Sequence, residues 1–152
     1  MEIAFFKAKC SSCEALFETP LLNDFSYGEF IARSKDGVYT AYLNAIEEPV
    51  VKEINLIFDN LFEEYCIDTN KSSCFQFVIG KCSDMVEGQE MWIDIPPICP
   101  YCGSQNCIYD NLSLVGTRDI EKLSFDSFAN LDDNVREELI KEYINEFIKL
   151  NK

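Results

Sequence analysis

Cysteines are the side chains of this sequence best suited to chemistry, and four of the eight form two Cys-x-x-Cys pairs. The first pair is Cys10 and Cys13. The second is Cys99 and Cys102, in the segment ICPYCGSQNC at 98–107. Two intervening residues let both sulfurs of a tight turn face one ion, so two pairs can supply the four ligands of a tetrahedral metal site. The same spacing is also found in reactive dithiols.

Histidine is absent from the 152 residues. This excludes Ser-His and Cys-His nucleophile pairs and every metal site with a histidine ligand. Cysteines and carboxylates remain as possible ligands, and we expect any metal to be held mainly by sulfur. The sequence therefore predicts one structural zinc ion per chain, with Cys10, Cys13, Cys99 and Cys102 as its ligands.

The residues around the second pair favour the metal site over a dithiol. A reactive dithiol needs its first cysteine at the N-terminus of a helix, where backbone N–H groups stabilise the thiolate. Here the pair is followed by Gly-Ser-Gln-Asn at 103–106, which is typical of a turn, and then by a β-prone stretch from Cys107. Upstream, 91–95 alternates as a strand does. We expect a hairpin of strand, metal-binding turn and strand over 91–113. A CPYC dithiol oxidoreductase with glutaredoxin-like chemistry is the alternative.

The two pairs together resemble the metal-binding turns of the zinc-ribbon, or rubredoxin-like, superfamily. The resemblance implies a small β core around a structural four-cysteine site, and because rubredoxin itself holds iron, zinc and iron both stay open. The 85 residues between Cys13 and Cys99 must then be an insertion that leaves the site and returns to it. Glu14 follows the first pair at a position where the family often has glycine, whereas Gly103 follows the second.

The expected fold class is α+β, in a single domain over 1–152, because this length can bury a sufficient core without disulfides. We place the zinc-ribbon parts at about 2–18 and 91–113, and the insertion at about 19–90. A C-terminal helix is expected at about 132–150, where apolar residues recur at helical spacing after Asp and Asn caps.

The insertion has its own predicted elements. Two β-rich runs joined by Ser-Lys-Asp-Gly predict a hairpin at 27–43. An amphipathic helical pattern follows Pro49, which suits the first turn of a helix. The run at 74–80, CFQFVIG, is too short to separate a strand from a buried helix.

The other four cysteines are Cys66, Cys74, Cys82 and Cys107. Their spacing matches no metal template, and free cysteines are often small buried side chains, so we expect them in the core. Cys107 is the exception, because it follows Cys102 by five residues and can approach the site as an outer neighbour.

Charge restricts the partners. The chain has 27 acidic and 13 basic residues and a net charge of −14. Nucleic-acid binders place Lys and Arg against phosphates, so we expect no nucleic acid partner. Residues 49–98 are the most acidic part, with nine acids and three lysines. This surface is either a solvated face or a binding site for a basic protein.

The sequence carries no Walker loop, dinucleotide-binding glycine motif or serine nucleophile elbow. It also has no apolar run of membrane length, and its N-terminus is unlike a signal peptide, so we expect a cytoplasmic protein without a membrane partner. The sequence thus predicts a non-enzymatic, zinc-stabilised protein interaction module, and an immunity or antitoxin-like role against a basic toxin is one concrete form of it.

Overall fold

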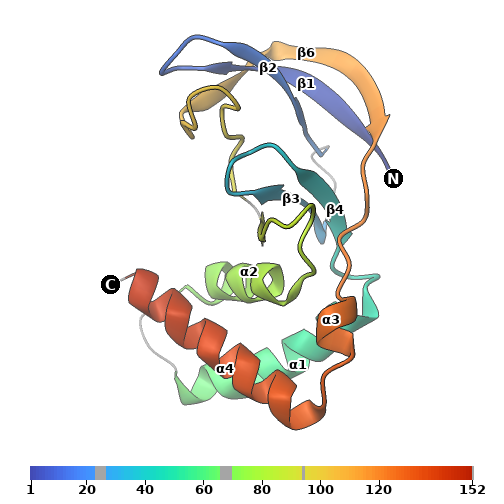
Figure 1. Cartoon of the computed structure of the whole chain (residues 1–152), viewed down its shortest axis with the longest axis vertical. Helices are drawn as coiled ribbons and strands as arrows, with labels where there is room; N and C mark the ends of the chain where they lie inside the picture. The colour runs from blue at the N-terminus through green and yellow to red at the C-terminus, as the bar shows by residue number, and fades with distance from the viewer. Residues whose placement is uncertain (23–26, 66–69, 94, 152) are drawn as a thin grey trace.

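The computed structural model describes residues 1–22, 27–65, 70–93 and 95–151. Within these residues, two antiparallel three-stranded sheets and four helices are arranged along the long axis, with the first sheet at one end and the helices at the other (Figure 1). The second sheet lies between them. The predicted α+β class is confirmed.

The first sheet joins the two ends of the sequence. It contains β1 (Glu2–Cys10), β2 (Leu16–Pro20) and β6 (Cys107–Asp119) in the order β2-β1-β6. β1 and β2 form a local hairpin, whereas β6 pairs with β1 after most of the chain has intervened. Cys107 lies directly opposite Cys10 in this pairing. The return of β6 therefore carries the second cysteine pair to the first.

The second sheet contains β3 (Glu29–Ser34), β4 (Thr40–Asn44) and β5 (Met91–Ile93) in the order β4-β3-β5. The hairpin predicted at 27–43 is confirmed, since β3 and β4 are antiparallel neighbours. Its turn ends at Gly37, whose φ of 77° is in the left-handed region that glycine adopts without strain.

The hairpin expected over 91–113 is wrong. β5 pairs with β3, with Ile93 opposite Ala32, and belongs to the second sheet. β6 pairs with β1 in the first sheet. The strand upstream of the second cysteine pair and the strand downstream of it therefore pair with different partners, and the residues between them cross from one sheet to the other.

The helices are α1 (Pro49–Glu64), α2 (Lys71–Cys82), α3 (Asp126–Ala129) and α4 (Asp133–Leu150). α1 begins at Pro49 as predicted, after a Glu48 cap that accepts from the N–H of Val50. The open assignment at 74–80 is resolved as helix, within α2, and the C-terminal helix predicted at 132–150 is confirmed as α4. No helix in the described residues combines the length and apolar character needed to cross a membrane.

The large hydrophobic core lies between the second sheet and the helices. Its largest fully buried apolar side chains are Phe58, Leu43, Ile54, Ile79, Ile140, Ile144 and Val78. The first sheet contributes only Ile3 to a small separate cluster with Ile31 and Tyr42 of the second sheet. The first sheet, whose strand ends adjoin the cysteine pairs, therefore has little apolar core of its own.

Candidate metal centre

The structure brings the four predicted metal ligands into one cluster. The Sγ atoms of Cys10, Cys13, Cys99 and Cys102 all lie within 4.8 Å of one another. Cys10 Sγ is 3.5 Å from Cys102 Sγ. Cys13 Sγ is 3.6 Å from Cys99 Sγ. In a tetrahedral zinc site with Zn–S bonds of about 2.3 Å the sulfurs are about 3.8 Å apart, so the cluster can hold one metal ion.

Strand pairing and local turns position these sulfurs. Cys10 is the last residue of β1 and lies opposite Cys107, the first residue of β6. The first turn therefore leaves the first sheet at the same end at which the chain enters it from the second turn. The turns also contact each other directly: the Ser11 N–H donates to the carbonyl of Asn106 at 2.7 Å. The cluster is consistent with a zinc-ribbon-like site whose two halves are separated in the sequence.

The two turns have the same backbone hydrogen bonds. In the first, the N–H of Glu14 donates to the carbonyl of Cys10 at 2.9 Å. In the second, the N–H of Gly103 donates to the carbonyl of Cys99, also at 2.9 Å. Glu14 has a φ of 64° and Gly103 a φ of 75°. The first turn therefore adopts the geometry of the second, although its left-handed position carries a side chain.

A second contact between the turns was not predicted. The hydroxyls of Ser12 and Ser104 lie 2.9 Å apart and form a hydrogen bond across the cluster. No spacing rule marks these serines, because their partnership depends on the closure of the two turns around one centre.

Each turn contributes one buried and one exposed cysteine. Cys10 and Cys99, the first of each pair, are fully buried, while Cys13 and Cys102 are exposed. The centre therefore lies at the surface of the first sheet, with two ligands anchored inside and two at the solvent boundary.

The pKa values of two thiols in contact, Cys10 and Cys102, are shifted in opposite directions. The backbone N–H of Cys13, 3.4 Å from Cys10 Sγ, is the main cause that lowers the pKa of Cys10 to about 6. The Ser104 N–H lowers the pKa of Cys102, but the contacts of its sulfur with the other three cysteines of the cluster, Cys10 first, outweigh this effect and raise the pKa to about 12. Two sulfurs in contact cannot both ionise without strong repulsion. A divalent cation would remove this repulsion and allow all four to be thiolates.

The remaining cysteines fall into two groups. Cys74 and Cys82 belong to α2 and are buried in the large core, where burial raises the pKa of each to about 12. The core role predicted for these two is confirmed, while Cys66 lies outside the described residues. Cys107 is half-buried beside the centre, and its thiol donates to the carbonyl of Ser104 at 3.5 Å. Burial and the neighbouring Cys10 raise the pKa of Cys107.

A buried arginine fastens the first sheet to the second. Arg33 of β3 donates to the carbonyl of Ile95 at 2.8 Å and to that of Pro20 at 3.1 Å. Ile95 precedes the second turn and Pro20 ends β2. Sequence alternation identifies β3 but does not identify these partners. The contacts hold the segment leading to Cys99 against the first sheet.

Comparisons with models of protein families, with curated proteins and with solved structures find no match to this chain.

Proposed function

We propose that this protein is a non-enzymatic interaction module, in which four thiolates hold one structural zinc ion and an acidic surface binds a basic protein. The observation that carries the metal part is the convergence of four sulfurs from sequence-distant turns within 4.8 Å. Zinc accepts an all-sulfur tetrahedral site and has no redox chemistry of its own, so it would act as a cross-link between β1 and β6.

A closed four-cysteine site supports the non-enzymatic proposal. Structural zinc sites fill all four positions with protein ligands, whereas catalytic zinc keeps one position for water or substrate. Here four sulfurs are available for the four positions. Zinc bound in this way would stabilise the first sheet without activating a water molecule.

Three features weigh against the CPYC oxidoreductase alternative. Cys99, which would be the nucleophile, is fully buried. It lies in a turn that leads into β6, and no helix of the described chain begins beside it. The helix N-terminus that stabilises a reactive thiolate is therefore missing from its surroundings. Its sulfur also contacts Cys13 of the other pair.

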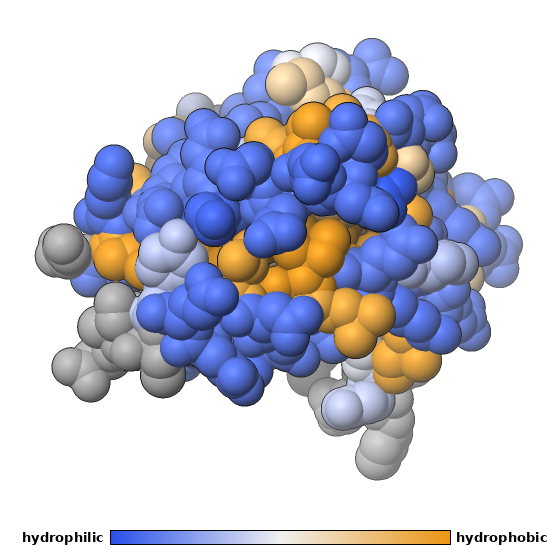
Figure 2. Space-filling model, turned by 90° about the horizontal axis from the view of Figure 1, so that it is seen from below, coloured by the Kyte–Doolittle hydropathy of each residue, from blue (hydrophilic) through white to orange (hydrophobic). Residues whose placement is uncertain are grey.

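Charge and surface composition support a basic partner. With 27 acids and 13 bases, the chain would attract a protein of opposite charge. Viewed from the helical end, the molecule has apolar surface between hydrophilic side chains (Figure 2). The helices also leave some apolar side chains exposed, including Leu56 on α1 and Val135 on α4. Such a surface suits a basic protein with apolar residues, for example a toxin bound by an immunity or antitoxin-like protein.

The partner proposal can be tested by affinity capture at low ionic strength from the native source, followed by association rates at increasing salt. We expect a basic protein whose association slows as salt rises, because exposed charges are screened. The double substitution Glu63→Lys/Glu64→Lys should make this association slower than that of the wild type. Both acids are exposed and have no ion pair within the described residues, so reversal should leave the fold intact.

Not every acidic residue of α1 is suited to this test. Glu53→Lys is unsuitable as a binding test, because Glu53 pairs with Arg136 at 3.0 Å and its reversal disturbs the helices. Specific retention of DNA or RNA by the wild type, or an unchanged rate for the doubly reversed variant, would contradict the proposed acidic binding surface.

A further inference from the structure

A fifth cysteine lies beside the candidate metal centre. Cys107 is the first residue of β6 and Cys10 is the last residue of β1. The two lie directly opposite each other beside the centre. Side chains of directly opposed residues project from the same face of an antiparallel pair, with Cβ atoms about 4.5–5.5 Å apart. The thiol of Cys107 is therefore next to the Cys10 sulfur, while Cys107 is not one of the four residues whose ligand atoms lie within 4.8 Å of one another.

We propose that Cys107 is a reserve ligand for the position of Cys10. This inference rests on the proposed metal site. When Cys10 cannot bind, the Cys107 S–H bond breaks, its proton passes to solvent, and a zinc–sulfur bond forms from the resulting thiolate. No electron is transferred, so the exchange needs no oxidant or reductant. The metal stays bound to four sulfurs.

The geometry favours substitution at Cys10 over substitution at the two exposed ligands. Cys107 lies opposite Cys10 on the neighbouring strand, and its thiol donates to the carbonyl of Ser104, which follows the second turn. Cys13 and Cys102 are the exposed, outer ligands and lie beyond the strand ends. A rotation of the Cys107 side chain can bring its sulfur toward the place that the Cys10 sulfur leaves empty. The outer positions would require the backbone of β6 to move.

The experiment compares two ligand losses with and without the fifth thiol, using Co²⁺ as the probe metal in the full chain. The variants are Cys10→Ala and Cys102→Ala, each alone and combined with Cys107→Ala. Bound Co²⁺ per chain gives the stoichiometry, and the thiolate-to-cobalt charge-transfer absorption reports the number of sulfur ligands. We expect Cys10→Ala to bind one Co²⁺ with the absorption of four thiolates, and Cys10→Ala/Cys107→Ala to lose that absorption. Cys107→Ala should make no difference in the Cys102→Ala background.

Equal loss of Co²⁺ binding in Cys10→Ala and Cys102→Ala would overturn the reserve-ligand role and leave the four-cysteine site standing. A wild-type chain that binds no Co²⁺ would overturn both. If Cys10→Ala fails to fold, Cys10→Ser gives the same comparison with a side chain of similar shape. Four-thiolate absorption that disappears with Cys107→Ala supports the proposal, and three-thiolate absorption in Cys10→Ser opposes it.

Discussion

Glu14 occupies a left-handed backbone position in the first cysteine turn, where the second turn has glycine. It has a φ of 64° at the position that Gly103 occupies in the second turn. A residue with a Cβ is strained in this region, and glycine is not. The turn nevertheless keeps the same backbone hydrogen bond as its counterpart. The surrounding sheet and turn contacts therefore impose this conformation on Glu14.

We predict that Glu14→Gly stabilises the protein by about 1 kcal/mol, because the relief of backbone strain exceeds the added entropy of the unfolded chain. Chemical denaturation of the metal-loaded protein measures this. Glu14→Ala is the matched control, since it removes the charge and keeps the Cβ. An equal gain from Glu14→Ala would show that charge, rather than backbone strain, is the cause.

Cys102 and Cys82 allow the ligand role to be separated from packing. Cys102 is exposed and Cys82 is buried, so side-chain burial alone predicts the larger loss of stability for Cys82. We predict the reverse for the first sheet: Cys102→Ser should remove the protection of β1 and β6 amides from hydrogen exchange, while Cys82→Ala should leave it unchanged. Protection of β1 and β6 that survives in Cys102→Ser would argue against a structural metal.

At the scale of single residues, the spacing of the four cysteines was sufficient to select the cluster that the structure brings together. It could not identify the contacts between the turns, such as the hydrogen bond of Ser12 with Ser104, or the position of Cys107 opposite Cys10. These contacts depend on the register of β6 against β1, two strands that lie far apart in the sequence.

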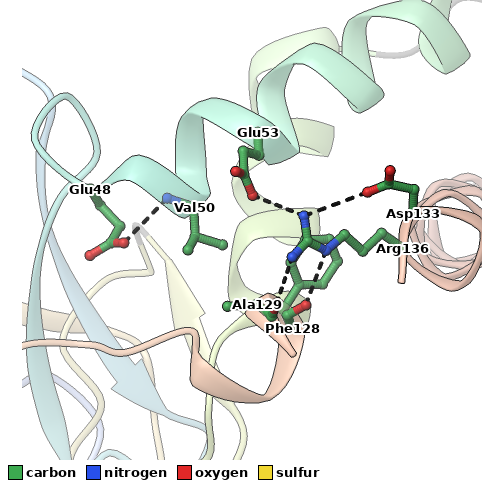
Figure 3. A network of polar contacts seen from close by, with 7 residues as sticks. All are labelled: Glu48, Val50, Glu53, Phe128, Ala129, Asp133 and Arg136. Carbon is green, nitrogen blue, oxygen red and sulfur yellow. Dashed lines mark hydrogen bonds and ion pairs between the residues drawn. The ribbon is translucent and has the colours of Figure 1, made fainter. Parts of the chain in front are cut away.

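Arg136 is the residue that joins three of the helices (Figure 3). Its guanidinium donates to the carbonyls of Phe128 and Ala129 near the end of α3, at 3.3 and 2.6 Å. It also pairs with Glu53 of α1 at 3.0 Å and lies over the Phe128 ring. Only 15% of its side chain is exposed. One cation therefore caps α3 while linking α4 to α1.

We predict that Arg136→Met destabilises the protein by about 2 kcal/mol, because partly buried carbonyl groups lose a charged donor. Glu53→Gln should cost less than about 1 kcal/mol, because Glu53 is half exposed and its ion pair is screened by water. Thermal unfolding of the two variants gives the comparison. Equal losses would mean that the ion pair, rather than the bonds to α3, holds the helices together.

The sequence predicted those elements whose signals are local. The β3–β4 hairpin has its turn glycine, and α1 and α4 have their caps within a few residues of the apolar pattern. The alternation of 91–95 correctly indicated a strand, which the structure shows at Met91–Ile93, but it assigned this strand to the wrong sheet, because pairing with β3 is a long-range choice. Asp94 lies outside the described residues. The helix that contains 74–80 is capped by Asn70, whose side chain accepts from the N–H of Ser73, but this cap precedes the apolar run and is not part of its pattern.

At the scale of the molecule, the apolar contacts that stabilise the fold are divided unequally between the first sheet and the rest of the structure. The large core joins the second sheet to the helices, whereas the first sheet has one small apolar cluster and the cysteine centre. Metal binding and folding are thermodynamically coupled when the ligands come from separate segments. We therefore expect the metal to stabilise the first sheet in particular.

We predict that a zinc chelator unfolds the first sheet and spares the helices. Helical circular dichroism should persist in the chelated protein, while hydrogen exchange of β1 and β6 becomes rapid. Re-addition of zinc should restore protection. Loss of the helical signal together with the sheet would contradict this division and indicate that the metal supports the whole molecule.

The most direct test of the account is the metal content of untagged protein purified under reducing, chelator-free conditions. The four converging thiols predict one tightly bound zinc ion per chain, with Cys10, Cys13, Cys99 and Cys102 protected from alkylation until the metal is removed. A metal content near zero, together with a reversible disulfide between Cys99 and Cys102, would contradict the structural site and favour the dithiol oxidoreductase.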